Sequence, residues 1–210
     1  MAYRDRPTAG NALAAHLHPY TGDPNAVVLG LLRGGIPVAA CVAAVLRLPL
    51  DALSVRKLGV PWAPEVAFGA LGPGGAVVLN EEIAARLDPT AMHAVLRRER
   101  TELDRRERRY RLGRPPPTID GRTAIIVDDG LATGATARVA VDVLHRMGAR
   151  RVVFAAPVGS AEGIARVAER ADEVVCPLRP ATFDAVSRHY DDFRQVSDLE
   201  ILRHLAIPHD

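Results

Sequence analysis

Short runs of consecutive apolar residues alternate with helical segments along most of this 210-residue chain. The runs have the length of buried strands, and they span residues 26–32, 51–57, 123–127, 151–156 and 173–176. Helical periodicity follows three of them, at residues 37–47, 135–147 and 161–170. Parallel strands need long crossover connections, which are usually helices. The alternation therefore predicts an α/β fold in which a parallel sheet is covered by helices on both faces.

The other segments are expected to surround this core. A helix is expected over residues 9–20, a strand over 77–79, and a long helix from Asp88–Pro89 to about Leu112, before Gly113 and Pro115–Pro117. Residues 59–75 are rich in glycine and proline, so they predict a loop, with a short strand at 67–71. Residues 178–210 predict a small lid with a terminal helix from Ser197. We expect one domain over residues 1–210, with a core at about 25–177 and a lid made from 1–24 and 178–210.

Composition excludes several classes of protein. A hydrophobic fraction of 48%, a charged fraction of 25% and a net charge of +2 indicate a globular chain and exclude a disordered or collagen-like one. The longest apolar stretch, Ala26 to Leu50, is broken by Arg33 and two glycines, so no membrane span is predicted. No apolar segment follows the first charged residues, and we expect a cytoplasmic protein. Cys41 and Cys176 lie in apolar runs and are expected to be buried thiols.

The basic residues are 26 arginines and one lysine, Lys57. Eight of the arginines lie in residues 97–111, beside four acids. Acids precede arginines by four residues at Glu102, Asp104 and Glu107, a spacing that stabilises a solvated helix. This pattern favours a surface helix with an apolar stripe at Leu96, Leu103 and Tyr110 over a nucleic-acid surface, and we expect no nucleic-acid partner.

The most informative segment joins a buried strand to a helix at residues 125–136, with the sequence IIVDDGLATGAT. Its phosphate loop consists of Gly130, Leu131, Ala132, Thr133, Gly134, Ala135 and Thr136. The free N–H groups at a helix N-terminus, the helix dipole and two threonine hydroxyls together form a site for a phosphate dianion. In open α/β sheets such ligand sites lie at the carboxyl ends of the strands.

Two adjacent carboxylates, Asp128 and Asp129, precede this loop. They would repel a phosphate unless the ligand also offers hydrogen-bond donors or a metal ion. We expect them to accept hydrogen bonds from the 2′- and 3′-hydroxyls of a ribose phosphate, or to reach a Mg²⁺ through water. A Walker A site is excluded because its lysine and spacing are absent, and no G-x-G-x-x-G follows the first strand. The alternative is a plain strand-to-helix turn whose acids cap the helix.

Residues 124–136 resemble the signature of type I phosphoribosyltransferases, a hydrophobic strand, an acid pair and a Thr-Gly-x-Thr-like loop. Within that family the chain is similar to a bacterial subgroup, through DDGLATGATAR, FDAV and YDDF. The resemblance implies binding of phosphoribosyl pyrophosphate with Mg²⁺ and displacement of pyrophosphate from ribose C1 by a nitrogen acceptor, with inversion. It implies a parallel sheet with a small hood, a homodimer, and no covalent nucleophile, so no Ser, Cys or His is selected.

The resemblance also implies a second anion site, for pyrophosphate. Arg33, Gly34 and Gly35 follow the first strand, where backbone N–H groups can approach an oxyanion. A purely structural Gly-Gly turn is the alternative. Arg56 and Lys57 end the next predicted strand at the same edge, and residues 58–75 look like the family's mobile flap. Arg33, Lys57, Asp128 and Asp129 are the candidate catalytic residues, although chance alone could place the lone lysine there.

The acceptor stays open. Enzymes of the family that act on 6-oxopurines often carry an acid where this chain has Ala132, which leaves adenine-like, pyrimidine and non-nucleobase acceptors. Residues 181–193 could supply a ring that stacks on a base, but inward packing of these aromatics is favoured. The alternative functions are a non-catalytic sensor of phosphoribosyl pyrophosphate and a ribose-phosphate enzyme such as a phosphorylase. The seven histidines, among them His16, His93, His145 and His189, are assigned no site role because their spacing suits no metal site.

Overall fold

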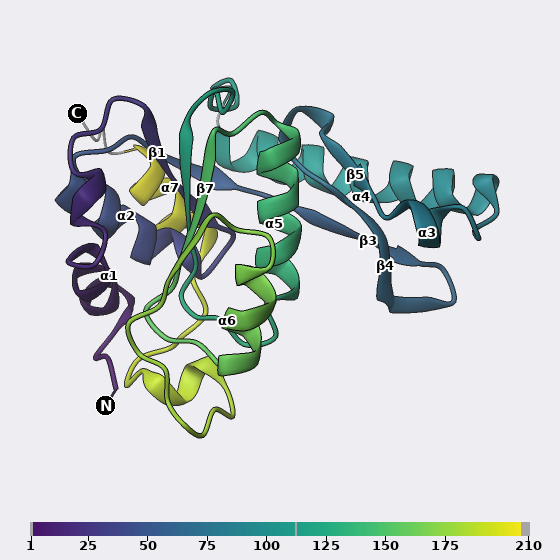
Figure 1. Ribbon diagram of the computed structural model, residues 1–210. Coiled ribbons are helices and arrows are strands. Elements are labelled where there is room, and N and C mark those ends of the chain that lie inside the picture. The colour runs from purple at the N-terminus through teal and green to yellow at the C-terminus, as the bar shows by residue number, and fades with distance from the viewer. Residues whose placement is uncertain (1, 112, 207–210) are drawn as a thin grey trace.

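A five-stranded parallel sheet forms the centre of the computed structural model, which describes residues 2–111 and 113–206. The strand order is β2-β1-β6-β7-β8. The strands are β1 (Ala26–Leu31), β2 (Leu50–Leu53), β6 (Thr123–Val127), β7 (Arg151–Ala155) and β8 (Glu173–Val175). Helices cover both faces of this sheet (Figure 1). The α/β fold class predicted from the alternating pattern is therefore confirmed.

Each face of the sheet carries its own pair of helices (Figure 1). One face packs against α1 (Arg6–Ala14) and α2 (Gly35–Leu46), and the other against α5 (Ala135–Arg146) and α6 (Ala161–Ala168). The helix predicted at 9–20 is observed as α1, which begins earlier, at Arg6, and ends at Ala14. A 3₁₀ turn, η1 (His18–Tyr20), follows it. No helix within the described ranges is both long and apolar enough to cross a membrane.

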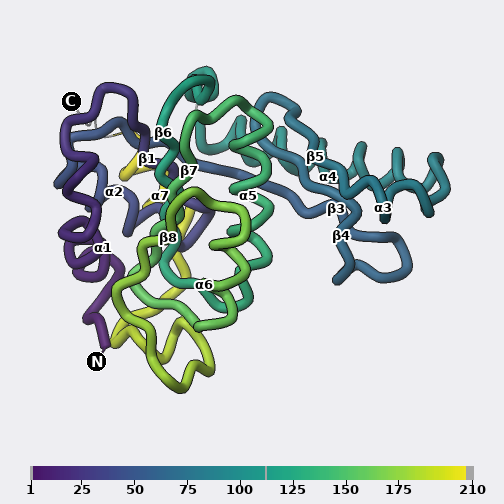
Figure 2. Tube along the Cα trace, viewed as in Figure 1, coloured from purple at the N-terminus to yellow at the C-terminus, as the bar shows by residue number. Residues whose placement is uncertain are grey.

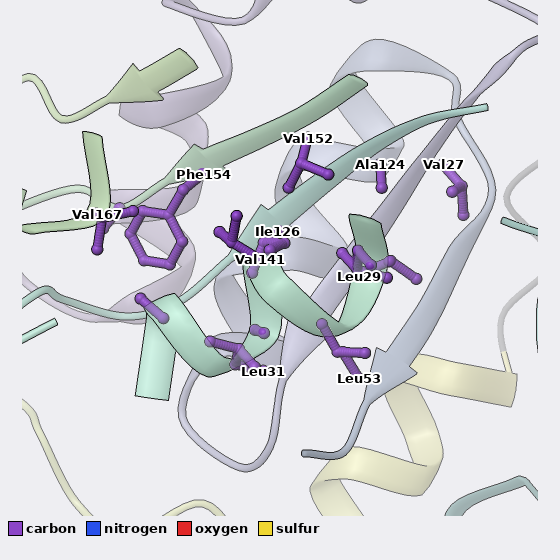
Figure 3. Close-up of a cluster of buried hydrophobic side chains, with 14 of the residues drawn as sticks. Val27, Leu29, Leu31, Leu53, Ala124, Ile126, Val141, Val152, Phe154 and Val167 are labelled. Carbon is purple, nitrogen blue, oxygen red and sulfur yellow. The ribbon is translucent and has the colours of Figure 1, made fainter. Parts of the chain in front are cut away.

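The apolar runs are continuous because both faces of the sheet are buried. In β1, Val27 and Leu29 point toward α5, whereas Val28 points toward α1 and α2. Figure 3 shows the first of these two layers, where the ring of Phe154 lies beside Val167. A strand covered on one face only would alternate apolar and polar residues, so the continuous run encodes the double covering.

The strand predicted at 51–57 is wrong as a single strand, because only its first half belongs to β2. The loop predicted at 59–75 is also wrong, although the short strand expected within it at 67–71 is confirmed as part of β4. Register explains the first error: β2 pairs with β1 only as far as Leu31–Leu53, where β1 ends. The chain then leaves the core and forms a separate antiparallel sheet of β3 (Arg56–Val60), β4 (Ala63–Leu71) and β5 (Val77–Leu79), with η2 (Pro73–Gly75) before β5. Strand 77–79 is confirmed, but it belongs to this second sheet.

The second sheet and its helices extend to one side of the parallel sheet (Figure 2). It is accompanied by α3 (Glu81–Ala84) and by the long α4 (Pro89–Arg111), whose Val95 and Leu103 pack on Phe68 of β4. The expected end of α4 at Leu112 lies outside the described residues. The arginine-rich helix is therefore more than a solvated surface, since its other face covers this sheet.

The lid differs from the expectation at the N-terminal end. Helix α1 packs on α2 as part of the core layer, so it is not a lid. Only the first residues join the tail, where Tyr3 forms an isolated bridge with Tyr190. The tail contains η3 (Val186–His189) and the terminal helix α7 (Asp198–Ala206), which packs on α2 and α4. The expected helix start near Ser197 is confirmed.

We expect Phe154→Ala to lower the free energy of unfolding by about 3–5 kcal/mol, because Phe154 of β7 is fully buried and its removal leaves a cavity. Urea denaturation measures the change. Val45→Ala, at an exposed position of α2, is the control and should stay within about 0.5 kcal/mol of wild type. A loss below about 1 kcal/mol for Phe154→Ala would contradict the described packing.

Candidate functional site

The phosphate loop predicted at residues 130–136 lies between β6 and the start of α5, at the carboxyl edge of the parallel sheet. Gly134 caps α5 with a left-handed backbone (φ 75°), which glycine adopts without strain. Thr133 and Thr136 are exposed beside the first turn of the helix. Unpaired N–H groups of a first helical turn and the helix dipole favour an anion at this position.

The neighbouring β7–α6 connection holds this loop in place by hydrogen bonds. The N–H of Leu131 donates to the oxygen of Val158 (2.9 Å), and the N–H of Ser160 donates to the oxygen of Leu131 (2.8 Å). The hydroxyl of Ser160 donates to the oxygen of Ala132 (2.6 Å). Leu131 is buried, whereas Ala132 and Ala135 are exposed. The loop is thus anchored on one side and open to a ligand on the other.

The two acids, Asp128 and Asp129, lie directly before this loop and are both largely enclosed by protein. The backbone N–H of Asp129 donates to Oδ1 of Asp128 (2.9 Å). Desolvation, and secondarily the charge of Asp129, raises the pKa of Asp128 well above its usual range. Desolvation also raises the pKa of Asp129, although Arg6 opposes that shift. The site thus holds two desolvated carboxylates that can accept hydrogen bonds from a ligand.

Arg6, at the start of α1, reaches this acid pair from the other end of the chain. Its Nε and Nη2 both lie 2.8 Å from Oδ2 of Asp129, so Arg6 does not use Oδ1 of that carboxylate. The guanidinium also lies over the ring of Phe193 (4.0 Å to the centroid). Tyr190 donates its hydroxyl hydrogen to the backbone oxygen of Asp129 (2.6 Å). Sequence reasoning missed Arg6, because Asp5-Arg6-Pro7 is typical only of a helix start.

The aromatics of the tail pack inward, as favoured from the sequence. Tyr190 packs against Tyr3 and Phe193, at 5.8 and 5.0 Å between ring centroids. Phe183 stacks on His189 at 5.4 Å. The described tail therefore covers the acid pair and is itself held by ring contacts.

The glycines predicted to bind pyrophosphate, Gly34 and Gly35, lie against the acid pair. A Cβ on Gly34 would be 2.1 Å from Oδ2 of Asp129, and one on Gly35 would be 2.4 Å from the oxygen of Val127. These glycines are required because the loop after β1 passes so close to the end of β6. The side chain of Arg33 points elsewhere, toward Asp198 of α7 at 3.7 Å.

Arg56 and Lys57 start β3 of the second sheet and line a separate cavity of about 520 Å³. The guanidinium of Arg56 pairs with the buried Glu99 of α4 at 2.6 Å. The Nζ of Lys57 is exposed and donates to the backbone oxygen of Glu65 (3.2 Å). The same cavity is lined by Ala135 and Thr136 of the phosphate loop and by Leu32, which precedes Arg33.

The predicted site residues thus form two neighbouring groups. Gly34 and Gly35 contact Asp128 and Asp129, whereas Arg56 and Lys57 share the cavity with the end of the phosphate loop. Within residues 2–111 and 113–206, no three His, Cys, Asp or Glu side chains are arranged to hold a metal ion by themselves. A cation at the acid pair would therefore need oxygen ligands from the bound molecule as well.

The chain is similar to proteins of one family. The sequence model described as "Phosphoribosyl transferase domain" matches residues 71–192, more than half of the chain. The protein TT1426 from Thermus thermophilus has a crystal structure that superposes with a TM-score of 0.90, at 43% sequence identity, covering 98% of each chain.

Two curated relatives extend this similarity. "Putative phosphoribosyl transferase Rv0571c" of Mycobacterium tuberculosis (strain H37Rv) is 50% identical over 209 residues, which are 99% of this chain and 47% of the relative. This chain therefore spans about half the length of that relative. The uracil phosphoribosyltransferase of Lactobacillus gasseri is 41% identical over 59 residues, which are 28% of each chain.

We expect Asp128→Asn to stabilise the free protein at pH 7. A raised pKa means that the folded state holds the proton more tightly than the unfolded state, so wild-type stability falls as pH rises from the ordinary pKa of aspartate through the raised one. Asparagine removes this buried charge and keeps an oxygen that can accept the N–H of Asp129. The gain should be about 0.5–2 kcal/mol at pH 7 and should shrink toward pH 4.

Urea denaturation at both pH values measures this difference. Asp104→Asn is the control, because Asp104 is exposed on α4 and should change stability by less than about 0.5 kcal/mol. A clear loss of stability in Asp128→Asn at pH 7 would contradict the described desolvation of this carboxylate.

Proposed function

Because the chain belongs to the phosphoribosyl transferase family, we propose that it transfers the 5-phosphoribosyl group of phosphoribosyl pyrophosphate to a nitrogen acceptor and releases pyrophosphate. The observation that carries this proposal is the phosphate loop at residues 130–136, which directly follows two desolvated carboxylates. The β7–α6 connection holds one side of this loop by hydrogen bonds, and its other side is exposed. A ribose phosphate matches both parts, since its phosphate suits the helix N-terminus and its hydroxyls suit the acids.

The ribose is proposed to lie over Asp128 and Asp129. Their carboxylates accept hydrogen bonds from the 2′- and 3′-hydroxyls, and Oδ1 of Asp129 is the oxygen that Arg6 does not engage. Magnesium fits this donor set, because Mg²⁺ is commonly held by one or two carboxylates together with substrate phosphates and water. When bound, it supplies positive charge to the diphosphate. Arg6 keeps Asp129 oriented while the sugar binds.

The pyrophosphate group is proposed to lie between the loop after β1 and the start of β3. Backbone N–H groups at Gly34 and Gly35 are proposed to donate to its oxygens. Arg33, Arg56 and Lys57 supply positive charge near the group whose negative charge grows during departure. Residues 58–75, which belong to β3, β4 and η2, would cover this side as the flap.

A planar nitrogen base is the proposed acceptor. The local similarity to a uracil phosphoribosyltransferase supports a pyrimidine, and the exposed Ala132 supplies no carboxylate of the kind expected for 6-oxopurines. The chain needs no covalent nucleophile, because the reaction displaces pyrophosphate directly. Positioning and charge neutralisation are then its main contributions.

A screen of nucleobases and amines with phosphoribosyl pyrophosphate and Mg²⁺ tests this function. Pyrophosphate release is the readout, and uracil, cytosine and adenine are the first acceptors. Release with at least one acceptor supports a transferase. Tight binding of phosphoribosyl pyrophosphate with a silent panel would support a sensor, and no binding at millimolar concentration would overturn both.

We expect Thr136→Val to weaken binding of ribose 5-phosphate by about 1–3 kcal/mol, because a charge-assisted hydrogen bond to the phosphate is lost. The melting temperature should barely change, since Thr136 is exposed. Calorimetry measures the affinity, and Thr101→Val, at an exposed position of α4, is the matched control. Lower stability with unchanged affinity would instead assign Thr136 a structural role.

Lys57→Ala is expected to lower kcat about 100- to 1,000-fold, with a smaller effect on binding of phosphoribosyl pyrophosphate, because the charge it stabilises develops in the transition state. Steady-state kinetics with the acceptor found in the screen measures this split. Arg97→Ala, which removes an exposed charge of α4, is the control. An unchanged kcat would remove Lys57 from the mechanism.

A further inference from the structure

Four arginines surround a small pocket between α4 and α7. The pocket has a volume of about 220 Å³ and is lined by Leu32, Arg33, Arg105, Arg106, Arg109, Tyr110 and Asp198. Three of the arginines come from one face of α4, and the fourth precedes the Gly34–Gly35 turn after β1. This arginine pocket is not part of the phosphate loop, because no residue of 130–136 lines it.

The pocket carries an excess of positive charge. The carboxylates that pair with its arginines are Glu102, which binds Arg105 and Arg106, and Asp198. Four guanidinium groups thus face two carboxylates. All four remain accessible, with side-chain exposures of 44% for Arg33, 56% for Arg105, 32% for Arg106 and 50% for Arg109. Such a concentration of donors suits an oxyanion with several oxygens.

Asp198 marks where an oxyanion would bind. Its carboxylate accepts a hydrogen bond from the hydroxyl of Tyr110 (2.5 Å), and it pairs with Arg109 and, at 3.7 Å, with Arg33. The carboxylate of Asp198, in α7, is therefore an anion that residues of α4 and of the loop after β1 already bind. One such pair would suffice to fix α7, so the second arginine at Asp198 exceeds what that contact requires.

The other two arginines are held ready by Glu102, which lies one turn before them on α4. Its Oε2 accepts from Nε of Arg105 (2.7 Å), and its Oε1 accepts from Nε of Arg106 (2.8 Å). These contacts fix both guanidinium groups and leave part of each free for other acceptors, since a guanidinium has five N–H donors. The pocket also adjoins the larger cavity, because Leu32 and Arg106 line both.

We propose that this arginine pocket binds a phosphate-type oxyanion, which takes over the contacts that Asp198 now makes with Arg33 and Arg109. The volume suits a small ion, since it equals the space of several water molecules of about 30 Å³ each. Binding would also exchange the partner of Arg33, the residue that adjoins the Gly34–Gly35 turn. This proposal does not depend on the transfer reaction, although the pocket shares Arg33 with the proposed pyrophosphate site.

Calorimetric titration with inorganic pyrophosphate, without magnesium, tests the pocket. The double variant Arg105→Gln/Arg109→Gln should weaken binding about tenfold or more, because charge-assisted hydrogen bonds are lost. Arg108→Gln is the matched control, since Arg108 is exposed on the same helix and does not line the pocket. Asp198→Asn should strengthen binding about threefold, because the competing carboxylate loses its charge.

The opposite effects of the two variants separate binding from folding. Thermal melts show whether α7 stays attached in Asp198→Asn, and a merely structural Asp198 would not raise the affinity for an anion. Wild-type affinity in the double arginine variant, with an unchanged melt, would overturn the proposal. Weaker binding in a stably folded Asp198→Asn would also overturn it.

Titration of the same variants with phosphoribosyl pyrophosphate distinguishes the source of the oxyanion. A parallel loss in the double variant would assign the pocket to the diphosphate of that ligand. Unchanged affinity for phosphoribosyl pyrophosphate, with weaker binding of pyrophosphate, would assign it to a separate anion. If wild type does not bind phosphoribosyl pyrophosphate at all, the proposed function fails while the pyrophosphate result stands.

Discussion

The contact between the guanidinium of Arg6 and the carboxylate of Asp129 holds the candidate site together. It joins the start of α1 to the end of β6, and both side chains are nearly buried, at 10% and 14% exposure. Removing one partner from such a pair leaves an uncompensated charge in a desolvated place, which is far more costly than losing a surface ion pair. The tail adds Phe193 and Tyr190 to the same contact, so segments from the N-terminal and C-terminal parts of the chain meet at the acid pair.

The acid pair lowers the stability of the free protein, and the apolar core of the sheet supports it. Desolvation of two carboxylates, Asp128 and Asp129, lowers the stability of the free protein, and Arg6 offsets part of that cost, more for Asp129 than for Asp128. The sheet beneath them is apolar on both faces, and its helices bury two hydrophobic layers. A site that holds such groups ready for a ligand has little reorganisation left to do when the ligand binds.

Positive charge is distributed around this acid pair in a definite order. Arg6 contacts Asp129 of the acid pair. The side chain of Arg33 points away from that pair, toward Asp198 and the arginines of α4. Arg56 is held by the buried Glu99 and faces the cavity that also contains Thr136. Each of these three cations pairs with a carboxylate, so each has a defined partner before any phosphate arrives.

The parallel sheet, the strand-to-helix loop at 130–136 and the position of the adjacent acids could all be predicted from the amino-acid sequence, whereas phosphate binding by this loop stays a prediction. They could be predicted because each depends on a local sequence pattern. Continuous apolar runs indicate burial on both faces of a sheet, and Gly134 with two threonines indicates the start of a helix. The remaining features depend on how distant segments pack. The second sheet arises because β2 loses its partner where β1 ends, and Arg6, Glu99 and Asp198 meet their partners across distances that no sequence spacing encodes.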